Sequence, residues 1–271
     1  MLPAGTTLGA VTLTIAHLPT SLEFYADVLG FTILKQTDHA ATLGTPEGTE
    51  LIHLHEAPGV TARPPQGAPG VYHYAVLLPQ SADLGRFVQV LKQHHIPAGA
   101  GDHLVSEAFY FSDPDGIGIE MYADRPREDW PVDEHGNIEM ATLPVDVEAL
   151  ERLAEGTTWA GIPNGTTIGH LHFHASDFAA ASQFYERTLG FDSLLKMGNS
   201  VHFLATGGYH HHIGINTWAR GGGENLASLS EWELVLPSEE SKTPVQERAG
   251  VQGDYIVGPD GVMVQLTVRR A

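Results

Sequence analysis

The sequence contains no cysteine. This absence excludes disulfide bonds, thiolate metal sites and cysteine nucleophiles. Any transition-metal site in this chain must therefore use imidazole and carboxylate ligands. A chain without cysteine is also compatible with the cytoplasm, which is the location we expect.

Basic residues are scarce, with 14 Lys and Arg against 33 Asp and Glu and a formal net charge of −19. An acidic surface repels phosphate backbones and anionic membranes, so we expect no nucleic-acid partner and no membrane partner. Long apolar runs are also missing, and the first ten residues lack a basic region followed by an apolar stretch. The sequence therefore predicts neither a membrane span nor a signal peptide.

Histidine, in contrast, is abundant, with 16 residues, and 42% of the chain is hydrophobic. A chain of 271 residues with this composition can bury a core and suits one large domain or two of ordinary size. The histidines are numerous enough to supply a metal site without cysteine.

An internal repeat is the most informative pattern in the sequence. The stretch 8–31 recurs as 168–191 at a constant offset, and both copies contain Phe-Tyr, three variable residues and Leu-Gly-Phe. The first copy has Ala10 where the second has His170. A repeat of this kind predicts repeated supersecondary units, and a residue that differs between the copies points to the chemistry.

Each copy has the pattern of a strand, a helix and three further strands. Residues 11–16 alternate apolar and polar side chains, Pro19 precedes a helical apolar pattern, and Gly30 stands at a helix C-cap position. Strand-like segments follow at 31–35, 39–43 and 50–55. This predicts a βαβββ module.

Three more modules follow the first, at 71–122, 167–218 and 228–269. The second has a predicted helix near 83–94, whereas the helix of the fourth is weakly encoded because it contains Pro244 and few apolar residues. We predict a first domain at 8–124, a linker at 125–165 and a second domain at 166–270. The second and fourth modules align so that His73 stands opposite Glu231 and Glu120 opposite Gln265.

The chain resembles the vicinal oxygen chelate superfamily, which includes glyoxalase I, bleomycin-resistance proteins and extradiol dioxygenases. The resemblance rests on the Phe-Tyr-x-x-x-Leu-Gly-Phe motifs and on Asp113-Pro-Asp-Gly followed by Glu120. It implies an α+β fold of four βαβββ modules that form two paired-module barrels. It also implies that metal ligands come from the first and last strands of paired modules.

Pairing of modules in chain order leaves each site incomplete. The first two modules offer Ala10, His73 and Glu120, and the last two offer His170, Glu231 and Gln265. Pairing of the second module with the third combines His73, Glu120 and His170, which is the two-histidine, one-carboxylate set of non-haem Fe(II) oxygenases. We therefore predict this non-sequential pairing and a metal site made of these three residues.

The resemblance to extradiol dioxygenases, and to catechol 2,3-dioxygenase in particular, implies further site residues. His211 aligns best with the family's acid–base histidine, although its neighbours His210 and His212 remain alternatives. His103 and Tyr110 correspond to a histidine and a tyrosine that these enzymes carry before the Glu ligand. His172 lies on the same strand face as His170 and is expected to line the substrate pocket.

These residues predict an Fe(II)-dependent extradiol dioxygenase that cleaves an aromatic diol with O2, with Mn(II) as an alternative metal. A hydroquinone-cleaving enzyme, a glyoxalase-like isomerase or transferase, and a drug-binding resistance protein are the alternatives. Glyoxalase-like enzymes use a fourth protein ligand, and the stretch 215–218 that corresponds to it has no Glu. A drug-binding protein needs no metal ligands. The sequence leaves a homo-oligomer open.

Overall fold

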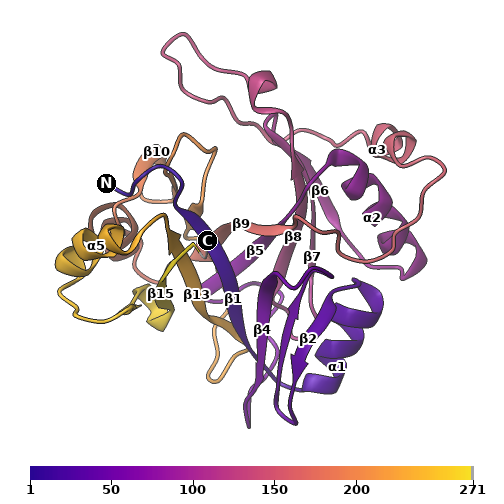
Figure 1. Cartoon of the computed structure of the whole chain (residues 1–271), viewed down its shortest axis with the longest axis horizontal. Helices are drawn as coiled ribbons and strands as arrows, with labels where there is room; N and C mark the ends of the chain where they lie inside the picture. The colour runs from indigo at the N-terminus through magenta and orange to yellow at the C-terminus, as the bar shows by residue number, and fades with distance from the viewer. Residues whose placement is uncertain (270–271) are drawn as a thin grey trace.

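The computed structural model describes residues 1–269, and two mixed β-sheets dominate this part of the chain (Figure 1). One sheet has the strand order β14-β15-β13-β1-β4-β3-β2, and the other has the order β10-β11-β12-β9-β5-β8-β7-β6. Few helices accompany these sheets, so the predicted α+β class is confirmed.

The first module follows the predicted order. Its helix continues into a π-helical segment that contains Phe24 and Tyr25, and Gly30 has the positive φ of 86° expected at the end of the helix. Its elements are β1 (Thr7–Ile15), α1 (Leu18–Leu22), η1 (Glu23–Val28), β2 (Thr32–Gln36), β3 (Ala40–Gly44) and β4 (Glu50–Glu56).

The second and third modules have the same order of elements. The second consists of β5 (Gly70–Leu78), α2 (Ser81–Gln93), β6 (Gly99–Asp102), β7 (Ser106–Ser112) and β8 (Gly118–Asp124). The third consists of β9 (Thr167–His174), α4 (Phe178–Gln183), η3 (Phe184–Leu189), β10 (Asp192–Met197), β11 (Val201–Ala205) and β12 (Ile213–Asn216).

The fourth module is shorter than the others. Within residues 1–269 it has β13 (Ser228–Leu236), η4 (Glu239–Ser241), α5 (Lys242–Ala249), β14 (Tyr255–Val257), η5 (Pro259–Gly261) and β15 (Met263–Val268). Helix α5 begins at Lys242, just before Pro244, so the proline stands in the first turn, where a missing backbone N–H is tolerated.

The modules pair out of chain order. Strand β5 of the second module pairs antiparallel with β9 of the third, and β1 of the first pairs antiparallel with β13 of the fourth. Figure 1 shows this exchange as the indigo strand β1 of the first module beside the orange-gold strand β13 of the fourth, with yellow β15 beyond it. The predicted non-sequential pairing is therefore confirmed, because each sheet combines strands from both halves of the repeat.

The division into domains at 8–124 and 166–270 stays a prediction, and its last residue, 270, lies outside the described residues. In the structure, each half of the chain contributes strands to both sheets. The segment that joins the halves contains η2 (Arg127–Asp129) and α3 (Val147–Leu153). It projects from the molecule as a hairpin before α3 packs beside α2 (Figure 1).

The core follows from the alternation of side chains along the central strands. On β5, Tyr74 and Val76 are buried in the main hydrophobic cluster, which also contains Leu13 of β1 and Trp232 of β13. Because neighbouring residues on a strand point to opposite faces, His73 and Ala75 point away from this cluster. Packing of Tyr74 and Val76 in the core thus fixes the position of β5, and the opposite face of this strand can carry the polar side chains of a site.

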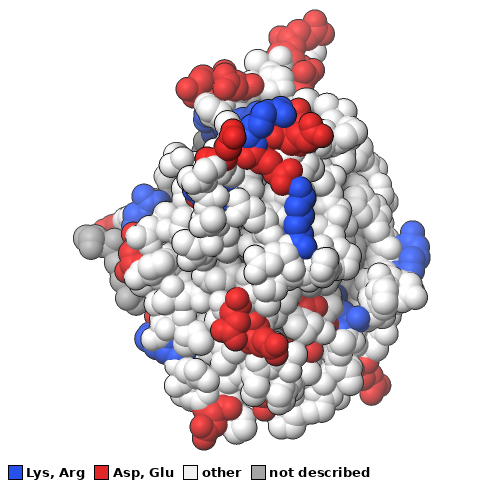
Figure 2. Space-filling view, turned by 90° about the vertical axis from the view of Figure 1, so that its right-hand side faces the viewer, with Lys and Arg blue, Asp and Glu red and all other residues white. Residues whose placement is uncertain are grey.

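None of the helices in the described part of the chain is both long and apolar enough to cross a membrane. Acidic side chains are grouped at the top of the molecule in Figure 2, at the level of the projecting hairpin in Figure 1. This distribution agrees with the strongly negative net charge of the sequence.

Candidate metal centre

Three side chains from three neighbouring strands meet on the face of the eight-stranded sheet that is opposite to the core. Ala75 of β5 stands in register with Glu120 of β8 on one side and with His170 of β9 on the other. His73 lies two residues before Ala75 on the same face. The small side chain of Ala75 leaves a space between the three larger ones, and strand register alone brings them together.

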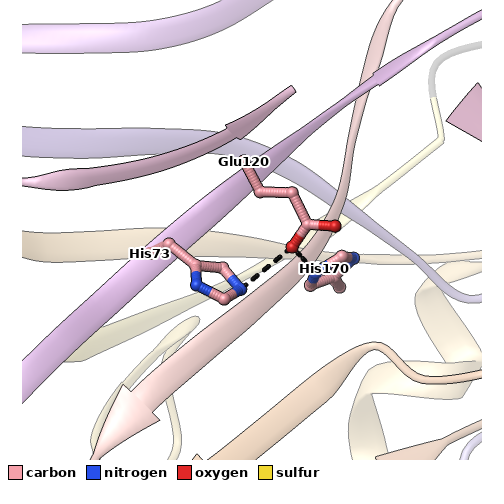
Figure 3. A group of neighbouring side chains, drawn as sticks. All are labelled: His73, Glu120 and His170. Carbon is pink, nitrogen blue, oxygen red and sulfur yellow. Dashed lines mark hydrogen bonds and ion pairs between the residues drawn. The ribbon is translucent and has the colours of Figure 1, made fainter. Parts of the chain in front are cut away.

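The three side chains are in direct contact. Nε2 of His170 lies 2.8 Å and Nε2 of His73 lies 3.1 Å from the same oxygen, Oε2 of Glu120. Figure 3 shows both contacts ending on this oxygen. All three residues are buried, with exposed fractions of 5%, 2% and 1% for His73, Glu120 and His170. Within residues 1–269 they form the single group of three or more His, Asp or Glu residues whose potential ligand atoms all lie within 4.8 Å of one another.

The separations fit a divalent metal ion. Ligand–metal bonds of about 2.1 Å that meet at right angles place two ligand atoms about 3.0 Å apart. The distances of 2.8 and 3.1 Å from Glu120 to the two imidazoles match this value. Two imidazoles and one carboxylate are also the donor set that suits Fe(II), and this set leaves coordination positions free for other ligands.

The protonation states favour metal binding. Burial opposes ionisation of Glu120, but the electrostatic influence and hydrogen bonds of the neighbouring imidazoles, first of His170 and then of His73, outweigh it, so the pKa of Glu120 is held well below its usual range. Burial lowers the pKa of His73. The site therefore offers an ionised carboxylate and a neutral imidazole at neutral pH, which are the forms that bind a metal.

A cavity of about 550 Å³ opens onto the cluster. Its lining includes His73 and Glu120, and no Lys or Arg of the described residues contributes to it. Apolar and aromatic side chains form most of the remaining wall, namely Tyr72, Met140, Leu195, Met197, Phe203 and Trp218. The shape and lining are those of a pocket for a small, largely apolar ligand.

His103 and Tyr110 form a pair at this cavity. Nε2 of His103 lies 2.6 Å from the Tyr110 hydroxyl, and Nδ1 lies 2.8 Å from the carbonyl oxygen of Ala141. Because a carbonyl oxygen only accepts, Nδ1 of His103 donates to it, and when His103 is neutral its Nε2 accepts a hydrogen bond from the Tyr110 hydroxyl. Burial, followed by the charge of Glu120, raises the pKa of Tyr110, so its hydroxyl stays protonated.

Of the three consecutive histidines, His211 lines the cavity. Its ring centroid lies 4.1 Å from that of His170. His210 instead contacts Asp124, and His212 packs beside Phe191. The sequence left three candidates for the acid–base histidine. Of these, only His211 faces the cavity that contains Glu120.

His172 also lines the cavity, and its orientation depends on Asn216, a residue that the sequence prediction missed. The backbone N–H of Trp218 donates to Oδ1 of Asn216 at 3.0 Å, so this atom is the amide oxygen. Nδ2 of Asn216 then donates to Nε2 of His172 at 3.0 Å. His172 therefore carries its proton on Nδ1. Asn216 falls within the stretch 215–218, where the sequence showed no Glu for a fourth ligand.

The segment between the two halves of the chain forms part of the site, which the sequence prediction did not include. Met140, Ala141 and Thr142 line the cavity. The backbone of Leu143 exchanges two hydrogen bonds with Asp102, at 2.8 and 2.9 Å. A segment predicted only as a connection thus closes the pocket on the side of the His103–Tyr110 pair.

Comparison with known proteins defines the class to which this fold and site belong. The family model of the glyoxalase/bleomycin resistance protein/dioxygenase superfamily matches residues 7–121. The catechol-2,3-dioxygenase of Bacillus subtilis (strain 168) is 44% identical over 248 residues, which cover 90% of this chain and 87% of that protein. The chain belongs to the glyoxalase/bleomycin resistance protein/dioxygenase superfamily, and the predicted similarity to an enzyme of the catechol 2,3-dioxygenase type is confirmed.

Solved structures support the fold. A candidate dioxygenase from Bacillus subtilis has a TM-score of 0.65 at 14% identity, with coverage of 99% of this chain and 87% of that one. A glyoxalase I mutant from Zea mays has a TM-score of 0.55 at 15% identity, with coverage of 97% and 94%. These likenesses confirm the four-module architecture and carry no information on substrate.

Proposed function

We propose that this protein is a non-haem Fe(II)-dependent extradiol dioxygenase that cleaves the ring of a catechol-type diol with O2. The observation that carries the proposal is the convergence of His73 and His170 on one oxygen of Glu120. The similarity to a catechol-2,3-dioxygenase over most of the chain supports the same reaction class. We include a cytoplasmic location in the proposal because the chain has no cysteine.

His73, Glu120 and His170 would hold the metal. When bound, Fe(II) supplies a common binding position for the diol and O2 and a path for electrons between them. The cavity residues supply binding and orientation. The apolar wall that includes Met140 and Phe203 excludes water from the aromatic ring of the substrate.

Two groups are placed to handle the protons of the diol. His211 lines the cavity and, as a neutral imidazole, can take a proton from one hydroxyl. The Tyr110 hydroxyl donates to His103 and therefore presents its oxygen lone pairs elsewhere, where they can accept a hydrogen bond from the other hydroxyl. The site thus provides one proton acceptor and one orienting acceptor beside the metal ligands.

A glyoxalase-like reaction is disfavoured by the ligand set. Enzymes of that type use a fourth protein ligand, and Asn216, in the corresponding stretch of β12, is occupied by hydrogen bonds to His172 and His174. A protein that only binds aromatic drugs needs no metal ligands. Here an ionised carboxylate is buried between two imidazoles at a cost in desolvation, which favours a metal-binding role.

The proposal is tested by anaerobic reconstitution with Fe(II), addition of catechol and then admission of air. We expect O2 uptake and a yellow ring-fission product, and no uptake by His170→Ala treated in the same way. Parallel reconstitution with Mn(II) identifies the metal, and a parallel assay with hydroquinone identifies the hydroxyl pattern. Absence of uptake with every catechol and hydroquinone would contradict the proposal.

A further inference from the structure

A chain of three side chains leads from the end of β8 to the substrate cavity. Oδ1 of Asp124 lies 3.0 Å from Nε2 of His210, and Nδ1 of His210 lies 2.8 Å from Nδ1 of His211. His211 is the member of this chain that lines the cavity. The other two lie behind it, and neither is a neighbour of the metal ligands in the sequence.

The direction of these hydrogen bonds follows from the chemistry of the groups. An ionised carboxylate only accepts, so Nε2 of His210 carries a proton and donates to Asp124. When the imidazole of His210 is neutral, its Nδ1 carries no proton and accepts. The group that faces it, Nδ1 of His211, must donate, which leaves Nε2 of His211 without a proton.

The surroundings hold this arrangement in place. The second carboxylate oxygen of Asp124 accepts from the Tyr209 hydroxyl at 2.9 Å, so Asp124 is fixed on both sides. The ring of Tyr209 lies 4.0 Å from that of His210, and the ring of Trp130 lies 5.3 Å from it on centroid distances. His210 is almost completely buried, with an exposed fraction of 1%. The ring therefore has little freedom to turn.

We infer that Asp124 and His210 are positioning residues that fix the tautomer of His211, with its proton on Nδ1 and its lone pair on Nε2. The inference rests on the proposed function, because it assigns the lone pair of His211 to the proton transfer from the diol. In that step the O–H bond of the diol breaks, its electron pair stays on oxygen, and an N–H bond forms at Nε2. No electron is gained or lost by the protein.

The arrangement matters because the opposite tautomer is inactive in this role. With a proton on Nε2, His211 would present a donor instead of an acceptor to the diol. An aspartate that holds a neighbouring histidine in one tautomer has the same effect in hydrolytic triads, where replacement of its carboxylate lowers kcat strongly. Here the control passes through a second imidazole.

The tautomer is read by 15N NMR of histidine-labelled protein loaded with Zn(II), which is diamagnetic. The His211 resonances are identified by their absence in His211→Asn. The tests use Asp124→Leu, which removes the acceptor, Asp124→Glu, which keeps a carboxylate, and Asp38→Leu as a matched control. The control makes the same substitution at an exposed aspartate between β2 and β3, in the other sheet. The kcat and KM for catechol are measured on the Fe(II)-loaded forms.

We expect the proton of His211 on Nδ1 in the wild type and in Asp38→Leu, with kcat within about threefold of each other. In Asp124→Leu we expect this preference to be lost, with kcat lower by about 10²-fold and KM within about threefold. Asp124→Glu should restore Nδ1 protonation and most of kcat. A proton on Nε2 in the wild type, or an unchanged tautomer in Asp124→Leu, overturns the inference. Failure to cleave any diol overturns the proposed function instead, and the NMR result still tests the hydrogen-bond assignment.

Discussion

Nε2 of His170 lies 2.8 Å from Oε2 of Glu120, although the two residues belong to opposite halves of an internal repeat. The contact exists because β9 of the third module pairs with β5 of the second, and β5 pairs with β8. A metal centre at this point is therefore a product of the exchange of modules between the two halves, and neither half contains it alone.

The hydroxyl of Tyr110 is predicted to orient the substrate. Tyr110→Phe should lower kcat/KM for catechol by about 10- to 100-fold, which corresponds to one hydrogen bond in a site that excludes water. Its metal content should be unchanged. Tyr255→Phe, on the other sheet and 52% exposed, serves as the control and should behave as wild type. Wild-type kcat/KM for Tyr110→Phe would show that the hydroxyl has no part in the reaction.

Met140 is predicted to limit the size of the substrate. Its side chain belongs to the segment between the halves and lines the cavity with Leu195 and Phe203. Met140→Trp should lower kcat/KM for 4-tert-butylcatechol by about 10-fold or more relative to catechol, because a pocket filled by an indole ring rejects added methyl groups.

The control for this prediction is Val132→Ala in the same hairpin. Val132 is 58% exposed and does not line this cavity, so the ratio of kcat/KM for the two diols should not change. An equal loss for both diols in Met140→Trp would contradict a role in selectivity and would indicate general damage to the site.

Asp113 is predicted to make stability depend on pH. Burial raises its pKa from 3.8 to about 7, although the backbone N–H of Ile117 and the Tyr25 hydroxyl hydrogen bond to it. A raised pKa means that the folded state holds the proton longer than the unfolded chain. The contribution of the protonated Asp113 to the free energy of unfolding is fully present below pH 3.8 and is lost as the pH rises through about 7.

Asp113→Asn removes this titration. Between pH 5 and 7 the free energy of unfolding of the wild type should fall by about 1.4 kcal/mol per pH unit relative to Asp113→Asn. Guanidinium unfolding at several pH values measures the difference. Parallel pH profiles for the two proteins would mean that Asp113 does not hold its proton in the folded state.

Gly169 is predicted to be required for packing under the metal site. A Cβ atom at this position would lie 1.7 Å from the Tyr122 hydroxyl oxygen. Gly169→Ala should therefore lower the free energy of unfolding by about 1–3 kcal/mol, because Tyr122 or β9 must move. Gly253→Ala is the matched control, since a Cβ there meets nothing within 4 Å. Equal stability of the two variants would contradict the steric argument.

Much of this structure follows from patterns in the sequence. The repeat predicted the modules, and the difference between Ala10 and His170 identified the copy that carries a potential ligand. The positions of His73 and Glu120 then required a partner from the other half. The modules are encoded locally, in motifs that each strand or helix carries by itself, and the resemblance to the superfamily then indicated which strand positions carry metal ligands.

Other parts of the site depend on contacts between distant segments. Asn216 is identified only by its hydrogen bonds to His172 and His174, and Asp124 only by its contact with His210. Met140 belongs to a segment outside the repeat and has no counterpart in the other half. Polar residues at strand ends and in a connecting segment are common in any protein, so no spacing or periodicity distinguishes these three.

The central claim, a metal centre built across the two halves, is tested most directly by metal analysis after anaerobic loading with Fe(II). We compare the wild type with His170→Ala and with Glu231→Ala, which changes the residue that aligns with His73 in the other pair of modules. We predict one equivalent of iron in the wild type and in Glu231→Ala, and loss of iron from His170→Ala. Iron retained by His170→Ala and lost from Glu231→Ala would contradict the account.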